Sequence, residues 1–292
     1  MNWNTAPIDN LVVNENIVTS TESDYSAFCS YLEKTSGITL GENKSYLVQS
    51  RLKSIMEQYS FKALGELLQM LNDRKNLTLE KLVVDAMTTN ETSWFRDEYP
   101  FEFLRDNILG SITMAQKKPF SIWSAACSYG HEPYSISIVV QEFLERNPGR
   151  IPAGLEIMAT DISSRVLDQS ISGLYRSFDT ERGLSAERKT KYFRKLDDKL
   201  QIRDDVRARV TFRKHNLITD CFPLGTFDLI FCRNVLIYFS NENKQTILKN
   251  MVKSLAPGGY LFLGGSEPMV NYSDKFDMVA CRPGVVHQLK EA

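Results

Sequence analysis

The segment that most constrains the fold runs from Phe120 to Ser137, with the sequence FSIWSAACSYGHEPYSIS. Its apolar start predicts a short buried strand, its small residues predict a tight turn, and the residues from Pro133 onward predict a helix. This order is typical of a Rossmann-type unit, in which a ligand approaches the backbone at a helix N-terminus. The glycine positions of the dinucleotide fingerprint fall on Ala125, Cys127 and Gly130, of which only the last is a glycine.

Glu132 lies at the expected start of this helix. A pyrophosphate is held there by free amides and the positive end of the helix dipole, and a carboxylate would oppose it. A cationic ligand fits this turn better than NAD does, and S-adenosylmethionine carries both a positive amino group and a sulfonium. The alternative is an ordinary turn in which Glu132 only stabilises the helix dipole, and this segment alone does not decide between them.

Size and charge limit the possible functions. A chain of 292 residues can form two domains, and its 42% hydrophobic and 24% charged content is typical of a globular protein. A net charge of -1 argues against broad binding to nucleic acid or to an anionic membrane. With no apolar run near the roughly 20 residues of a spanning helix and no signal-peptide pattern, we expect a cytoplasmic protein without direct membrane insertion.

Cysteine and histidine spacing indicates neither cross-links nor metal. The five cysteines are scattered without a CxxC pair, and the three histidines lack metal-ligand spacing. We therefore expect free thiols, no disulfide framework and no metal site.

The first 88 residues divide into a leader and a helical domain. Residues 1–20 show little helical periodicity and are expected to form a mobile leader. Helical spacing then predicts a small all-helical domain over 21–88, with helices at 23–36, 44–59, 61–71 and 79–87. Lys44, Arg51 and Lys53 gather positive charge on its second helix. These residues either dock an acidic partner or form a solvated face. From the sequence alone we favour the solvated face.

A linker loop is expected over 89–98. It contains Asn90, Thr92 and Arg96, whose side chains can make directed hydrogen bonds beyond what a plain connection needs. The loop is therefore expected to contribute to a site.

Residues 99–292 alternate between strand and helix patterns and predict a doubly wound α/β domain. Parallel strands are expected at 120–123, 155–159, 209–214, 227–232 and 260–264, with an antiparallel strand at 285–289. The segment 176–208 interrupts this alternation and predicts a small antiparallel β-subdomain.

Polar residues follow several of these strands, at the edge where open α/β sheets bind ligands. Asp161 ends the second strand, Asn216 and Leu217 follow the third, and Arg233 and Asn234 follow the fourth. Asp161 either accepts from ribose hydroxyls or only caps a helix over 162–170, and the sequence leaves both open.

Taken together, these segments resemble the chemotaxis receptor glutamate O-methyltransferases of the CheR family. The resemblance covers residues 22–290 and rests on signature segments in order and spacing: TTNETSWFR, WSAACSYGHEPYS, ATDIS followed by GLY, FCRNVLIYF and LAPGGYLFLGGSEPM. It implies a helical N-terminal domain and a Rossmann-like S-adenosylmethionine-dependent methyltransferase domain that carries a small antiparallel β-subdomain.

The resemblance also implies roles for individual residues. The cofactor contacts it implies are Asn90, Thr92, Arg96, Glu132, Asp161, Asn216, Leu217, Arg233 and Asn234. Asp161 would accept from the ribose, Asn216 and Leu217 would border the adenine, and Glu132 would meet the cationic methionyl end. Arg96 and Tyr238 are the implied catalytic residues, with packing as the alternative role for Tyr238. His131 and Trp94 depart from the family pattern.

The implied reaction transfers methyl from S-adenosylmethionine to glutamate carboxylates in the cytoplasmic domain of chemotaxis receptors, leaving S-adenosylhomocysteine. The turn at Asp197 and Asp198 is short and glycine-free, which resembles members that do not depend on a receptor C-terminal pentapeptide. There are two alternatives: a methyltransferase that acts on another acceptor, and a protein that senses the cofactor without catalysing a reaction. The net charge disfavours nucleic acid as an acceptor, and the presence of Arg96 and Tyr238 disfavours a sensor.

Overall fold

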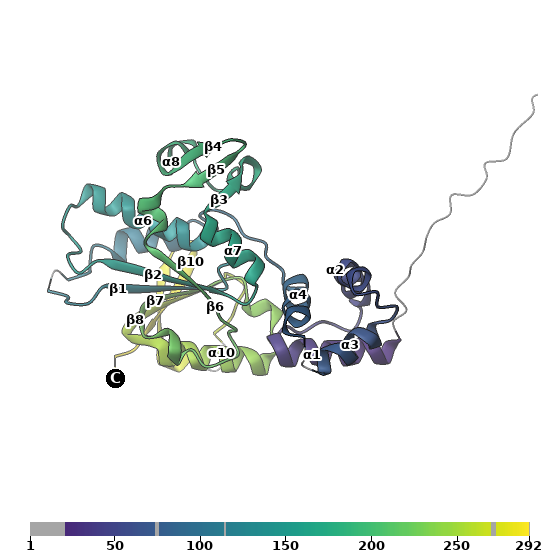
Figure 1. The fold of residues 1–292 in the computed structure, drawn as a ribbon. Coiled ribbons are helices and arrows are strands. Elements are labelled where there is room, and N and C mark those ends of the chain that lie inside the picture. Colours follow the sequence, from purple (N-terminus) through teal and green to yellow (C-terminus); the bar gives the residue numbers. More distant parts are fainter. Residues whose placement is uncertain (1–20, 74–75, 114, 270–272, 292) are drawn as a thin grey trace, which may run out of the picture.

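The computed structural model describes residues 21–73, 76–113, 115–269 and 273–291, and the leader expected at 1–20 lies outside these ranges. The described chain forms a helical part, an α/β part and a small β-subdomain that projects from the α/β part (Figure 1). The expected fold class is confirmed.

The helical part packs around one apolar core that includes Phe28, Leu52 and Leu67. Thr21 begins the first helix with a capping box, and Gly37 ends it in the left-handed conformation at a φ of 81°. The four expected helices are confirmed, although the third begins three residues later than expected. They are α1 Glu22–Ser36, α2 Ser45–Gln58, α3 Leu64–Asn72 and α4 Leu77–Met87.

The central sheet has seven strands in the order β6-β2-β1-β7-β8-β10-β9. The first five of these are parallel, and β10 and β9 are antiparallel. The strand order reverses between β1 and β7, which is where such sheets bind ligands. The strands are β1 Phe120–Ala125, β2 Leu155–Asp161, β6 Val210–Lys214, β7 Phe227–Cys232, β8 Leu255–Leu263, β9 Phe276–Cys281 and β10 Gly284–Leu289.

Two differences from the expected sheet have local causes. β9 has no counterpart among the expected strands because it is an edge strand that leaves Asp277 and Met278 exposed, so its apolar pattern is weak. β8 begins at Leu255, five residues before the expected start at Tyr260. The Pro-Gly-Gly segment lies within β8, at a register irregularity opposite β7.

Helices cover both faces of the sheet and create two cores. On one face, α5 and α6 pack on the strands, and on the other face α10 does so. The helices of this part are α5 Tyr99–Phe103, which continues as a π-helical turn over Leu104–Ile108, α6 His131–Arg146, α7 Ser164–Ser172 and α10 Asn241–Ser254.

The β-subdomain contains a three-stranded antiparallel sheet in the order β3-β5-β4. Its elements are β3 Leu174–Arg176, α8 Ala186–Tyr192, β4 Phe193–Leu196, β5 Lys199–Ile202 and, after it, α9 Asp204–Arg207. Asp197 and Asp198 form the two-residue turn between β4 and β5, with Asp197 at a φ of 52°. The expected short hairpin is therefore present.

Candidate functional site

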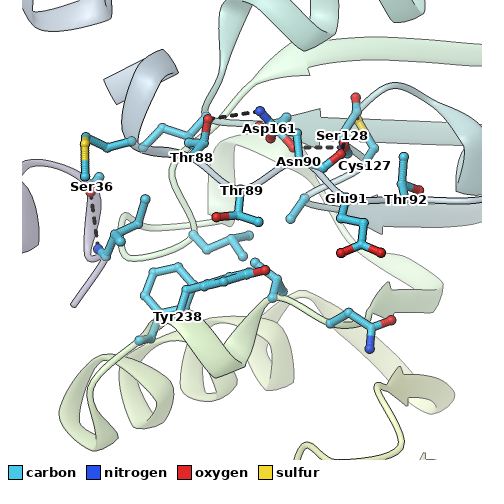
Figure 2. Close-up of a pocket in the computed structure, with 18 of the residues that line it drawn as sticks. Ser36, Thr88, Thr89, Asn90, Glu91, Thr92, Cys127, Ser128, Asp161 and Tyr238 are labelled. Atoms are coloured by element: carbon cyan, nitrogen blue, oxygen red, sulfur yellow. Dashed lines mark hydrogen bonds between the residues drawn. The ribbon is translucent and has the colours of Figure 1, made fainter. Parts of the chain in front are cut away.

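A pocket lies at the carboxyl ends of the parallel strands, between the α/β part and the helical part. In Figure 2 the linker residues Thr89, Glu91 and Thr92 lie on one side of this pocket and Tyr238 on the other. All ten residues proposed from the sequence line it: Asn90, Thr92, Arg96, Glu132, Asp161, Asn216, Leu217, Arg233, Asn234 and Tyr238. The fold thus gathers five separate segments around one cavity.

The turn between β1 and α6 is shaped by Asp161. Ala126 and Ser128 adopt positive φ angles of 57° and 50° in this turn. The Asp161 carboxylate accepts from the backbone N–H of Ser128 and of Ser163, each at 2.9 Å. The helix that follows is capped by the Ser163 side chain, so the interpretation of Asp161 as a simple N-cap is wrong. Burial raises the pKa of Asp161 and the backbone amides oppose that shift.

Glu132 occupies the first turn of α6 and is already partly neutralised. Its Oε1 accepts from the Ser124 hydroxyl at 2.8 Å, and its Oε2 accepts from Arg233 Nη1 at 3.0 Å. Burial raises the pKa of Glu132, while Arg233, Ser124 and Arg96 favour its ionised form. Each carboxylate oxygen has a second lone pair, so a further cationic donor from a ligand can join this group.

Arg233 is buried, with 1% of its side chain exposed. Besides Glu132, its Nη2 donates to the backbone oxygen of Arg96 at 2.8 Å and to Asp97 Oδ2 at 2.6 Å. Arg233 therefore fixes the linker against α6, a structural role that the sequence did not indicate.

The linker loop contacts the β1–α6 turn directly. The Ser128 hydroxyl donates to the backbone oxygen of Asn90 at 2.9 Å, and Asn90 Nδ2 donates to Thr88 at 3.1 Å, as drawn in Figure 2. Arg96 Nη1 makes a long bond of 3.4 Å to the backbone oxygen of Glu91. A side chain held this weakly can turn toward a ligand, unlike Arg233.

The helical part also helps to build the site. Asn216 Nδ2 donates to the backbone oxygen of Thr35 at 3.0 Å, at the end of α1. Four residues further on, the Thr39 N–H donates to the backbone oxygen of Tyr238 at 2.9 Å. The turn that carries Tyr238, a 3-10 turn over Leu236–Tyr238, is therefore held by the helical part.

Glu267 is a buried site-supporting residue that sequence reasoning missed. Its carboxylate accepts from three backbone N–H groups, those of Gly264, Asn234 and Leu236, at 2.6, 2.8 and 2.7 Å. It thereby holds the segment that carries Asn234 and leads to Tyr238. The only signal in the sequence was a carboxylate shortly after a Gly-Gly pair, which is too general to identify this role.

Arg51 also differs from its sequence interpretation. It donates to the backbone oxygen of Met87 at 2.7 Å and to the Thr89 hydroxyl at 2.9 Å, and it lines the pocket together with Lys44. Lys53 is exposed. Of the three basic residues, two belong to the pocket wall, so the group is not simply a solvated face.

Within the ranges that the structure covers, no group of three His, Cys, Asp or Glu side chains is arranged to hold a metal ion. All five cysteines are free thiols. None of the helices described is both long enough and apolar enough to cross a membrane.

Comparison with known proteins identifies the family. Residues 23–88 match the family model "CheR methyltransferase, all-alpha domain", and residues 90–285 match "CheR methyltransferase, SAM binding domain". The chain is 47% identical to chemotaxis protein methyltransferase 1 of Pseudomonas aeruginosa over 94% of this chain and 100% of the relative. It is 45% identical to the protein of that name from Vibrio cholerae, over 94% of this chain and 99% of the relative.

Among solved structures, the DhpI–SAH complex aligns with a TM-score of 0.35 and 11% identity over 68% of this chain and 69% of that one. The two family matches together span most of the chain, and the relatives match over nearly their whole length. The chain belongs to the CheR family and is an S-adenosylmethionine-dependent methyltransferase of chemotaxis.

Proposed function

We propose that this protein transfers a methyl group from S-adenosylmethionine to glutamate side chains of chemotaxis receptors, with Arg96 and Tyr238 as catalytic residues. The observation that supports this most is one pocket lined by both of them and by every proposed cofactor contact. The methyl acceptor would enter between the linker and Tyr238.

The donor set of the pocket fits this cofactor. Glu132 and Asp161 place two carboxylates at neighbouring points of the sheet edge, suited to a cationic group and to hydroxyls respectively. Leu217 is buried and offers an apolar surface for a base. Asn90, Thr92, Asn216, Arg233 and Asn234 complete the proposed binding set, with Arg233 acting through the linker and Glu132.

The chain would catalyse by placement and by excluding water. When bound, the cofactor supplies an electrophilic methyl group on sulfur. The acceptor carboxylate is already ionised near pH 7, so no general base is needed. Arg96 would hold that carboxylate with its planar fork, and Tyr238 would orient it or the methyl. The rate gain would come from holding the carboxylate oxygen in line with the methyl carbon, at about 3 to 3.5 Å. An ion pair between Arg96 and the carboxylate that is equally strong in the ground state and the transition state would not raise the rate.

We further propose that the acceptor lies in the cytoplasmic domain of the receptor and that the enzyme works in the cytoplasm. The two-residue turn at Asp197 and Asp198 supports independence from a receptor C-terminal pentapeptide, because it leaves no extended loop to grip one. The working division is a helical domain over 21–88, a linker over 89–98 and a methyltransferase domain over 99–292 that includes the β-subdomain 176–208.

The test is transfer of labelled methyl from S-adenosylmethionine to receptor cytoplasmic fragments. We expect label that is released by mild base, as a glutamyl methyl ester requires, and equal transfer to fragments with and without their last five residues. Label that resists base, or label on nucleic acid or a small molecule instead, would contradict the proposal.

A further inference from the structure

We propose that the β-subdomain braces the linker loop and so sets the position of Arg96, with Arg188 as the positioning residue. This inference rests on the proposed function only for the role of Arg96 in catalysis. The brace itself is a statement about the fold.

The linker backbone needs support from outside. Phe95, Asp97 and Glu98 have positive φ angles of 48°, 66° and 51°, and none of them is a glycine. Such conformations cost on the order of 1 to 3 kcal/mol each and persist only where surrounding structure enforces them. Arg96 lies in the middle of this strained run.

The first support is Trp94, which is buried in the β-subdomain with 1% of its surface exposed. Its Nε1 donates to the backbone oxygen of Asp179 at 2.9 Å. Its ring makes edge contacts with Tyr175 on β3 and Phe193 on β4, with centroids 5.0 and 5.2 Å away. Figure 1 shows β3 and β4 within the projecting subdomain, so Trp94 reaches out of the linker into it.

The second support is Arg188, on α8 of the β-subdomain. Its guanidinium carbon lies 3.9 Å from the centre of the Phe95 ring. The same guanidinium donates to both oxygens of Glu142 on α6, at 2.8 and 2.9 Å. The bidentate ion pair with Glu142 fixes the orientation of the guanidinium, and the same guanidinium therefore makes a well-defined cation–π contact with the Phe95 ring.

The linker is also held by the methyltransferase core. The Phe95 N–H donates to the Ser135 hydroxyl at 3.1 Å, and Arg233 binds the backbone oxygen of Arg96 at 2.8 Å. Phe95 is thus clamped between subdomain and core directly before Arg96. Because a displacement of about 1 Å at a reacting group can cost roughly 10²-fold in rate, loss of the brace should lower turnover without direct contact to the substrate.

The test compares Arg188→Met and Arg188→Lys in the full chain with Arg194→Met as the matched control. Arg194 lies in the same subdomain and also forms an ion pair, with Asp204 at 3.5 Å. It differs from Arg188 because it lies on β4, its side chain is 57% exposed, and it does not take part in the contact between α8 and Phe95. Two quantities are measured: hydrogen exchange of the amides of residues 94–98, and single-turnover methyl transfer to receptor fragments at saturating cofactor.

We expect amide exchange over 94–98 to be at least fivefold faster in Arg188→Met, with exchange unchanged outside the linker, α8 and the part of α6 near Glu142. Turnover should fall about tenfold while cofactor affinity stays within twofold, and Arg188→Lys should recover part of both effects. Arg194→Met should behave as the parent. If Arg188→Met fails to fold, Phe95→Leu replaces it, because it removes the ring face beneath the guanidinium and retains an apolar side chain.

Unchanged exchange over 94–98 would overturn the brace, and faster exchange with parental turnover would overturn its link to Arg96. A parent that transfers no methyl to receptors would contradict the proposed function, and the exchange comparison would still decide the brace. The two failures are therefore distinguishable.

Discussion

Arg233 Nη1 lies 3.0 Å from Glu132 Oε2, and Arg233 Nη2 donates to Asp97 and to the backbone oxygen of Arg96. The guanidinium therefore joins the Glu132 carboxylate to the linker. One buried cation thus connects the helix that bears a proposed cofactor contact with the loop that bears the proposed substrate contact. A buried charge of this kind is costly unless each of its partners stays in place.

Arg233→Lys should therefore destabilise the fold although it keeps the charge. A single ammonium cannot replace two nitrogens directed at three acceptors. We expect a loss of about 1 to 3 kcal/mol in the free energy of unfolding, measured by urea denaturation. Arg176→Lys is the control, because its pair with Asp179 is solvent-exposed on the arginine side at 74% and should leave the midpoint unchanged. Equal midpoints for both variants would contradict this account.

Glu267→Gln should impair the site although glutamine and glutamate have nearly the same size. An amide NH2 would replace one carboxylate oxygen and face a backbone N–H of Gly264, Asn234 or Leu236. Leaving a buried donor without an acceptor costs about 1 to 3 kcal/mol, and here the segment before Tyr238 would shift. We expect weaker binding of S-adenosylhomocysteine by calorimetry and slower single-turnover transfer. Glu102→Gln, on the exposed side of α5, should match the parent in both.

The fold was predictable because its signals are strong and local. Gly37 follows the first helix, which ends at residue 36 as expected, and FDLIFC forms a central strand, as its apolar content, interrupted only by Asp228, predicts. The pocket lining was predictable because parallel strands bring their carboxyl ends to one edge, so Asp161 and Asn216 line one pocket although they are 55 residues apart in the chain.

The supporting contacts were not predictable. Arg233 and Glu132 are separated by 101 positions in the chain, and nothing local distinguishes a guanidinium that binds a ligand from one that binds a carboxylate. Glu267 uses only backbone N–H groups, which carry no signature of residue type. The positive φ angles of Phe95 and Glu98 likewise arise from tertiary contacts, since neither residue type favours them.

His131 should make the fold sensitive to acid. It is buried between Trp94 and Tyr175, and burial lowers its pKa to about 4. An unfolded histidine has a pKa near 6.5, so between these values the unfolded state binds more protons. The corresponding stability is fully present above about pH 6.5 and is lost as the pH falls toward 4, up to about 3 kcal/mol. Urea unfolding at pH 7, 6, 5 and 4 should show a shallower decline for His131→Gln, and parallel curves for variant and parent would argue against this role.

Arg96→Ala tests the proposed carboxylate contact. The fold should survive, because Arg96 is only partly buried and makes one long bond to Glu91. Turnover at saturating cofactor should fall by roughly 10² to 10³, the scale of losing one preorganised electrostatic contact. Lysine should recover only part of the rate because it lacks the fork. Arg182→Ala, 74% exposed beside Glu91, is the control. A cofactor-saturated alanine variant that transfers methyl at the parental rate would remove Arg96 from the mechanism.

Gly183→Ala tests how closely the β-subdomain approaches the linker. Gly183 has a φ of 85°, and a Cβ placed on it would lie 1.8 Å from the backbone oxygen of Trp94, so the linker or the subdomain would have to move. Gly149→Ala is a closely matched control, because Gly149 has a φ of 74° and a Cβ there would meet nothing within 4 Å. Both variants carry the backbone cost of alanine at positive φ, about 1 kcal/mol, and only Gly183→Ala adds a collision. We expect Gly183→Ala to lower both the melting temperature and turnover well beyond Gly149→Ala. Similar losses in the two variants would show that the subdomain and linker separate easily, and that their contact is not what holds Arg96.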